Sequence, residues 1–309
     1  MSVRYIDIQQ PDDVGQRLDN FLMRQVKGVP RSMIYRIVRK GEVRVNGGRV
    51  AVSYRLALGD KVRLPPIRQS VDKPLQPNED LAQKLLNGVL FEDDNLLVLN
   101  KPFGVAVHGG SNIRYGVVET LRLHYGNDRL ELIHRLDRDT SGCLALAKNR
   151  RVLKELQAAF RERQVKKLYD LMVWGNWPRH TRTVQKKLQR YTTAWGERRV
   201  RVSAQGQSAR TDFDIVESGT QATWLQARIH TGRTHQIRVH AQASGHSIVG
   251  DTKYADPDHG RSPPVEVARL CLHARKLVLP YAGSHLKLHA AVPSDMHDIW
   301  RQIDQRDFS

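Results

Sequence analysis

The sequence is poor in cysteine, with only Cys143 and Cys271 among its 309 residues. Two thiols are too few for the disulfide framework of a secreted domain or for a four-cysteine zinc site. No apolar run approaches the roughly 18 residues that a membrane-spanning helix needs. The first residues contain Asp7, Asp12 and Asp13 where a signal peptide would have an apolar core. These absences predict a reduced, cytoplasmic protein that is neither exported nor held in a membrane.

Cofactor motifs are also absent. The sequence contains no GxxxxGK[ST] phosphate loop and no strand–GxGxxG–helix pattern, which argues against ATP-driven remodelling and dinucleotide chemistry. His230, His235 and His240 follow one another at five-residue steps, which alternate faces on a strand and share no face on a helix. Carboxylates or cysteines at ligand spacing do not accompany them. We therefore expect neither a metal nor a cofactor.

Acidic residues are outnumbered, since 50 Lys and Arg stand against 32 Asp and Glu and give a formal charge of +18. Such an excess favours polyanions, because neutralising phosphates releases condensed counterions. Residues 15–70 contain 13 basic and 3 acidic residues, so 13 − 3 places +10 of the total in this segment. A basic surface that serves only solubility is the simpler interpretation, but the concentration of charge favours a dedicated nucleic-acid-binding module.

This basic segment has the pattern of two helices followed by short strands. Residues 31–40 are predicted to form an amphipathic helix with an apolar side made of Met33, Ile34, Ile37 and Val38. Its other side carries the candidate phosphate contacts, which are Arg31, Arg36, Arg39 and Lys40. The preceding segment, 18–26, has an apolar stripe at helical spacing. Apolar and polar residues then alternate, with a turn at 46–48. This alternation predicts short strands at 43–46 and 61–64.

Four prolines between residues 65 and 77 indicate a linker between two domains. We expect a basic RNA-binding domain at 1–70, a linker at 71–79 and a larger domain at 80–309. The larger segment mixes helical and strand-like patterns without a repeating βα unit. The predicted fold class is therefore α+β with a mixed, mainly antiparallel sheet, and not a doubly wound parallel sheet.

The most informative segment is 134–142, which reads HRLDRDTSG and places Asp137 ahead of a turn and the apolar run 143–147. Three further motifs follow the same order as in one enzyme family: NKPFG at 100–104, KLY at 167–169 and TGRTHQIRVH at 231–240. Together they resemble the motifs of the pseudouridine synthases of the Rlu type. The first module resembles the small RNA-binding domain named after ribosomal protein S4.

This resemblance implies a reaction and its residues. Pseudouridine formation cleaves the bond between ribose and uracil nitrogen 1, turns the base and rejoins it through carbon 5, so no cofactor is needed. Asp137 corresponds to the family's catalytic aspartate, and Tyr169 to the tyrosine of the uridine pocket. Arg233 is expected to pair with Asp137, and Arg135 to fill the gap left by the flipped base. Asp139 occupies a position of the motif at which the residue type varies within the family, so a role in stabilising the turn or the surface is expected.

The resemblance further implies 23S ribosomal RNA of the large subunit as the partner, and we expect a monomer. It leaves open which uridines are modified. It also leaves open whether Asp137 attacks carbon 6 of the base, attacks the sugar or removes a ribose proton. Two alternatives are a non-catalytic ribosome-assembly protein that binds RNA with the same fold, and an N-glycosidase that would release free uracil.

Overall fold

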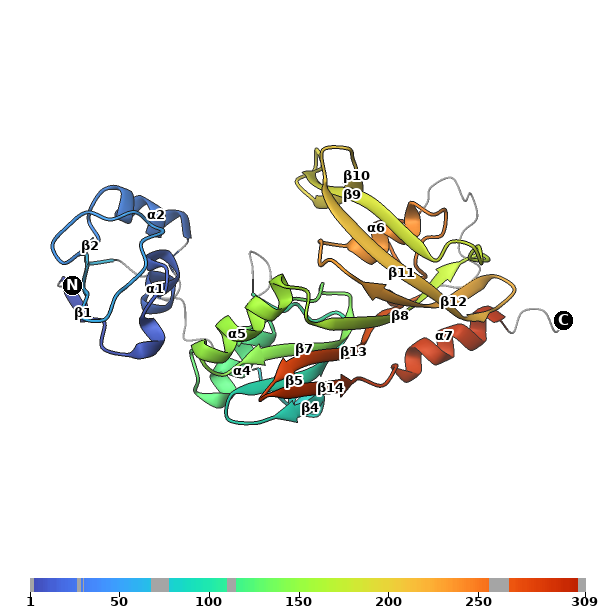
Figure 1. The fold of residues 1–309 in the computed structure, drawn as a ribbon, viewed down its shortest axis with the longest axis horizontal. Helices are drawn as coiled ribbons and strands as arrows, with labels where there is room; N and C mark the ends of the chain where they lie inside the picture. The colour runs from blue at the N-terminus through green and yellow to red at the C-terminus, as the bar shows by residue number, and fades with distance from the viewer. Residues whose placement is uncertain are drawn as a thin grey trace. The chain divides into compact units, whose positions relative to one another are not determined.

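The computed structural model describes residues 3–26, 29, 31–67, 78–109, 115–255 and 267–304, except for the side chain of Arg31. The chain divides into two compact units, residues 1–77 and 78–309 (Figure 1). Each unit has a hydrophobic core of its own. No helix in the described ranges is long and apolar enough to cross a membrane.

The first unit is a small α+β module. Its three strands, β1 (Arg4–Asp7), β2 (Arg44–Val45) and β3 (Lys61–Leu64), form an antiparallel sheet in the order β1-β3-β2. A short 3-10 turn (Pro11–Asp13) precedes the helices α1 (Leu18–Gln25) and α2 (Arg31–Arg39). The predicted turn is present, because Asn46 and Gly47 both have positive φ, at 51° and 78°. The sequence patterns did not predict strand β1.

Helix α2 has the two faces that its sequence predicts. Ile34, Ile37 and Val38 are buried in the core of this unit, and Met33 packs against that core. The helix ends at Arg39, one residue before the predicted end, because Gly41 adopts a left-handed conformation with φ of 72°. The burial pattern confirms the predicted orientation of the apolar side.

The second unit is built on one sheet of 11 strands. The strands follow the order β10-β9-β11-β12-β8-β13-β7-β5-β4, with β14 paired to β13 and β6 to β7. Their bounds are β4 (Val89–Glu92), β5 (Leu96–Lys101), β6 (Glu131–Leu132), β7 (Ser141–Ala147), β8 (Lys166–Trp174), β9 (Thr183–Thr192), β10 (Arg198–Val202), β11 (Gln207–Ser218), β12 (Ala222–Ile229), β13 (Leu272–Tyr281) and β14 (Ser284–His289). Only β13 and β7 pair in parallel among these described strands, which confirms the mixed, mainly antiparallel prediction.

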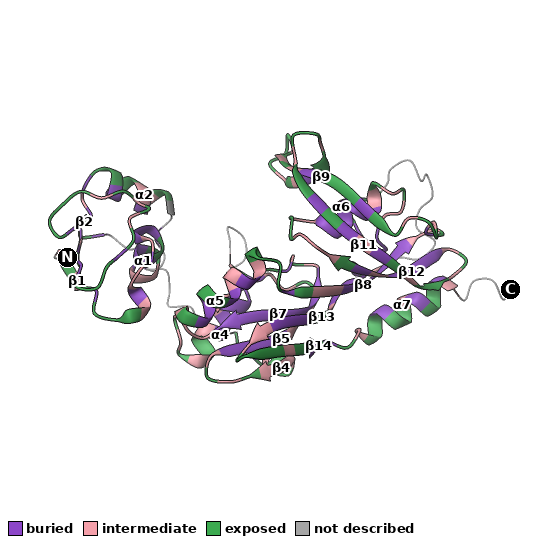
Figure 2. Ribbon diagram, viewed as in Figure 1, coloured by how far each residue is buried: buried purple, intermediate pink, exposed green. Residues whose placement is uncertain are grey.

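Five helices in the described part of this unit accompany the sheet: α3 (Glu79–Leu86), α4 (Val117–Tyr125), α5 (Arg150–Arg161), α6 (Gln236–Gln242) and α7 (Ser294–Asp304). Helix α3 begins at Glu79, inside the predicted linker, because the Asn78 side chain accepts a hydrogen bond from the Leu81 amide at 3.1 Å. The remaining residues of that linker, 71–77, lie outside the described residues. Figure 2 shows the central strands β5, β7 and β13 as largely buried.

The parallel pairing of β7 with β13 explains the glycine of the TSG sequence. Gly142 lies opposite Ala274, and a Cβ atom at Gly142 would stand 2.3 Å from the Ala274 carbonyl oxygen. Its φ of 111° also favours glycine. Any larger residue would therefore push the two strands apart directly beside the segment that carries Asp137.

Candidate active site

A cavity of about 240 Å³ lies where several segments of the second unit converge. It is lined by the loop between β6 and β7, by β8, by the turn from β12 into α6, and by Phe160, Arg190 and Leu272. Asp137, Tyr169, Arg135 and Arg233 all line this one cavity. Among the described lining residues Asp137 is the only carboxylate. The structure thus brings together the four residues that the motifs single out.

His134 and Thr140 fix the loop that carries Asp137. The Thr140 amide donates to the Asp137 carbonyl at 3.1 Å and closes a turn. The His134 Nε2 atom accepts a hydrogen bond from the Ala145 amide at 3.1 Å, and its ring stacks on Phe160. Burial lowers the pKa of His134 to about 3, so this imidazole is neutral and serves as an acceptor. The histidine of the HRLD motif is therefore a structural anchor.

Lys101, at the end of β5, fixes the same loop through a hydrogen bond to the Arg138 carbonyl. Its side chain is fully buried, and its ammonium donates to the carbonyls of Pro102 at 2.8 Å, Val105 at 2.8 Å and Arg138 at 3.0 Å. Burial lowers the pKa of Lys101 to about 7, opposed by the nearby carboxylates of Asp139 and Asp137. A protonated amine is needed to serve all three carbonyls, since a neutral amine has only two N–H groups. The motif NKPFG assigned no role to this lysine.

Ser141 is held by a buried network that includes the last helix. Its hydroxyl lies 2.9 Å from the His273 Nδ1 atom and accepts a hydrogen bond from Arg269 at 2.7 Å. Arg269 also binds both oxygens of Asp295, in α7, at 2.8 Å. These contacts fix the start of β7, and with it the loop that carries Asp137, against segments more than 120 residues later in the chain.

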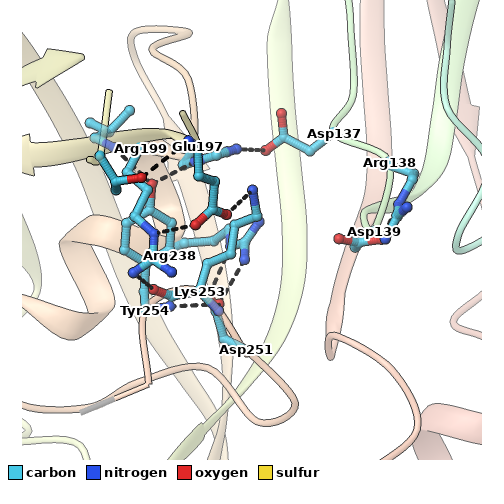
Figure 3. A network of polar contacts seen from close by, with 12 residues as sticks. Asp137, Arg138, Asp139, Glu197, Arg199, Arg238, Asp251, Lys253 and Tyr254 are labelled. Carbon is cyan, nitrogen blue, oxygen red and sulfur yellow. Dashed lines mark hydrogen bonds and ion pairs between the residues drawn. The ribbon is translucent and has the colours of Figure 1, made fainter. Parts of the chain in front are cut away.

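The imidazole of His235 lies beside Asp137. The His235 Nε2 atom lies 3.8 Å from an Asp137 oxygen, and its Nδ1 atom lies 2.6 Å from the Tyr254 hydroxyl. A left-handed backbone at His235, with φ of 52°, directly precedes α6. Burial lowers the pKa of this imidazole, and the Asp137 carboxylate opposes that shift. Figure 3 shows Asp137 facing a network that includes the buried ion pair of Arg238 with Asp251, at 2.7 and 2.6 Å.

The expected ion pair between Arg233 and Asp137 does not form. The Arg233 guanidinium donates to the Ser208 carbonyl at 3.3 Å. The reason is the local turn, in which the side-chain oxygen of Gln236 accepts the Arg233 amide at 3.1 Å and the Thr231 hydroxyl at 2.7 Å. This geometry sends the Arg233 side chain toward β11. Arg233 still lines the cavity, but His235 occupies the position beside the carboxylate.

Tyr169 and Arg135 have contrasting environments. Tyr169 is buried, and burial together with the Asp137 carboxylate raises the pKa of its phenol well above the usual range. It therefore remains a neutral hydrogen-bond donor beside Asp137. Arg135 is exposed at the cavity. Asp139, in contrast, is not among the lining residues; it pairs with Arg138 at 3.0 Å and lies apart from the network that Asp137 faces (Figure 3).

The histidines at five-residue steps have separate partners. His230 lies 2.5 Å from an Asp212 oxygen, and His240 lies 2.9 Å from the Thr211 hydroxyl. Within the described ranges no group of three His, Cys, Asp or Glu side chains is placed to hold a metal ion. The independence from metals and cofactors remains a prediction for experiment.

The basic side of α2 forms a second feature, within the first unit. Its exposed basic side chains, together with Ser32 and Tyr35, line a hollow of about 640 Å³; they are Arg36, Arg39 and Lys40. The side chain of the fourth predicted residue, Arg31, lies outside the described residues. Within the described part of this hollow there is no acidic residue. Its charge suits a phosphate backbone.

Comparison with known proteins agrees with this architecture. The family described as RNA pseudouridylate synthase matches residues 95–243, and the S4 domain matches residues 16–62. The ribosomal large subunit pseudouridine synthase C of Haemophilus influenzae is 46% identical to this chain, covering 98% of it and 95% of the relative. The protein of the same name from Escherichia coli K12 is 45% identical, covering 92% and 91%.

Solved structures give the same result. Human RNA pseudouridylate synthase domain containing 4 superposes with a TM-score of 0.60 at 28% identity, over 72% of this chain and 95% of that one. Human RNA pseudouridylate synthase domain containing 1 gives a TM-score of 0.57 at 26% identity, over 71% and 86%. With its motifs, its cavity and these similarities in agreement, the chain belongs to the pseudouridine synthases, a family of isomerases, and carries an S4 domain ahead of the catalytic domain.

Proposed function

We propose that this protein isomerises uridines of large-subunit (23S) ribosomal RNA to pseudouridine, with Asp137 as the catalytic residue. The observation that carries the proposal is the cavity in which Asp137 is the only carboxylate among the described lining residues and lies near enough to Tyr169 for its charge to raise the pKa of the phenol. The names of the relatives from Haemophilus influenzae and Escherichia coli support the choice of RNA.

The residues that line the cavity suit the successive steps of pseudouridine formation. The target uridine must leave its base stack, because its glycosidic bond is inaccessible there, and unstacking costs a few kcal/mol. Arg135, exposed at the cavity, fills the vacated place in the RNA. Asp137 then acts on the uridine as a nucleophile or base while Tyr169 holds the uracil ring. The bond to nitrogen 1 breaks and the bond to carbon 5 forms. Nitrogen 1 gains a proton and carbon 5 loses one, so the base is retained.

The decisive experiment maps pseudouridines in ribosomal RNA from cells with and without the gene for this protein. We expect particular pseudouridines of the large subunit to disappear and to return when the gene is restored. An unchanged map with altered ribosome assembly would favour the non-catalytic alternative. Release of free uracil by the purified protein would favour an N-glycosidase.

We further propose that residues 1–70 bind RNA, that residues 80–309 contain the complete catalytic apparatus and that the protein acts as a monomer in the cytoplasm. The division of roles is supported by the described cavity, whose lining residues all belong to the second unit. Light scattering of the active enzyme tests the monomer, since a constant dimeric mass would contradict it.

Replacing Arg31, Arg36, Arg39 and Lys40 by alanine is expected to weaken RNA binding and flatten its salt dependence. Each lost phosphate contact removes about 0.7–0.9 from the slope of log affinity against log salt. The rate at saturating RNA should change little, because Asp137 lies in the other unit. A salt titration alongside single-turnover rates measures both. Unchanged affinity and slope would show that this side of α2 is only a solvated surface.

A further inference from the structure

Lys167 is a cation at the candidate active site to which the motifs assign no role. It lies two residues before Tyr169 on β8, so both side chains are on the same side of the strand, and both line the cavity. Its ammonium lies 5.3 Å from the ring centre of Phe160. Within the described residues no hydrogen bond or ion pair reaches this ammonium. Burial lowers the pKa of Lys167, because the charged form has lost part of its hydration.

The charges around the cavity are unbalanced. The lining contains five basic side chains, namely Arg135, Lys167, Arg190, Arg233 and Arg238, against the single carboxylate of Asp137. Arg238 is neutralised by its buried pair with Asp251. Four cations without a carboxylate partner in the described structure therefore surround one anion. A cleft lined by charges of one sign concentrates ligands of the opposite sign, so this excess favours an anionic ligand.

The kind of anion follows from the substrate. Uracil is neutral, so its carbonyl oxygens offer a half-buried ammonium only part of the compensation that it needs. A nucleotide in an RNA chain has a phosphate on each side of its ribose, and each carries a full negative charge. A compact ammonium on a flexible stem binds phosphate as a point charge. The aromatic contact with Phe160 stabilises the ammonium and leaves its N–H groups free for such a ligand.

We propose that Lys167 binds a phosphate that flanks the target uridine and thereby fixes the flipped nucleotide in the cavity. This inference rests on the proposed function and adds to it a contact with the RNA backbone. Phosphate contacts position a nucleic acid without reading its sequence. Lys167 therefore sets how firmly any target uridine is held, and it does not select among uridines.

The test compares Lys167→Met, which keeps the length of the side chain and removes its charge, with Lys167→Arg, which keeps the charge. The matched control is Lys166→Met, since Lys166 is the exposed neighbour on the opposite side of β8. Loss of one charged hydrogen bond corresponds to about 10- to 100-fold. We expect Lys167→Met to lower the single-turnover rate at subsaturating RNA by this factor, Lys167→Arg to restore much of it, and the control to change it less than about threefold.

A substrate with a neutral methylphosphonate at either phosphate beside the target uridine separates a phosphate contact from a merely structural role. For the wild-type enzyme, neutralising the correct phosphate should cost about the same 10- to 100-fold. For Lys167→Met the same substrate should cost less than about twofold, because the contact is already lost. Equal losses for both enzymes at both positions would overturn the proposal. No pseudouridine from the wild-type enzyme on the unmodified RNA would instead contradict the proposed function.

Discussion

Asp137→Asn is expected to abolish pseudouridine formation, with the rate at saturating RNA falling by at least roughly 10³-fold. The amide keeps the shape of the side chain and removes the charge that makes it a nucleophile or base. RNA affinity should stay within a few-fold, because the cations that line the cavity remain in place. Single-turnover conversion of a uridine-containing ribosomal RNA fragment, with binding measured in parallel, gives both quantities.

Asp139→Asn is the matched control, since it makes the same chemical change two residues away. Asp139 pairs with Arg138 and does not line the cavity, so this variant should keep most of its activity. A surface ion pair of this kind contributes at most about 1 kcal/mol. If Asp137→Asn worked at a rate near that of the wild type, Asp137 would not be the catalytic residue.

Lys101→Met is expected to damage both stability and catalysis. The methionine fills a similar volume but leaves three part-buried carbonyls, those of Pro102, Val105 and Arg138, without this donor. An unsatisfied buried polar group costs about 1–3 kcal/mol, so the free energy of unfolding should fall by at least about 3 kcal/mol. Release of the Arg138 carbonyl also frees the loop that positions Asp137. The rate constant should therefore fall even at temperatures where the variant is folded.

Denaturant unfolding and single-turnover rates measured at low temperature separate the two effects. The control is Lys84→Met on helix α3, where the lysine is exposed and the same substitution should leave both quantities nearly unchanged. Wild-type stability in Lys101→Met would show that these three carbonyls do not depend on the ammonium.

Local patterns predicted the local structure well. The spacing of Ile34, Ile37 and Val38 predicted α2 to within one residue, and Asn46-Gly47 predicted its turn. Strand β1 was missed because its four residues are paired only at one edge of the sheet, and its identity depends on β3 far along the chain. The start of α3 was missed because a single capping side chain, that of Asn78, set it inside a proline-rich stretch.

At the candidate site, too, local motifs were predictive where tertiary contacts were not. The motifs predicted which residues meet, and Asp137, Tyr169, Arg135 and Arg233 do line one cavity. They did not predict which group lies beside the carboxylate. That outcome depends on the Gln236 hydrogen bonds and the left-handed backbone at His235, which direct one side chain toward Asp137 and the other toward β11. Contacts of this kind are set by tertiary geometry, and neither spacing nor periodicity encodes them.

The place of β13 in the sheet has a consequence for how the enzyme matures. Strands β7 and β8 follow each other in sequence, yet β13 separates them in the sheet, and it begins only at Leu272. In a nascent chain that has not reached this residue, strand β7, which follows the Asp137 loop, and strand β8, which carries Tyr169, lack the strand that joins them in the sheet. Because such long-range pairing is slow to form, we expect the cavity to be complete only after β13 has been synthesised. Until then the chain has its S4 domain but no complete cavity.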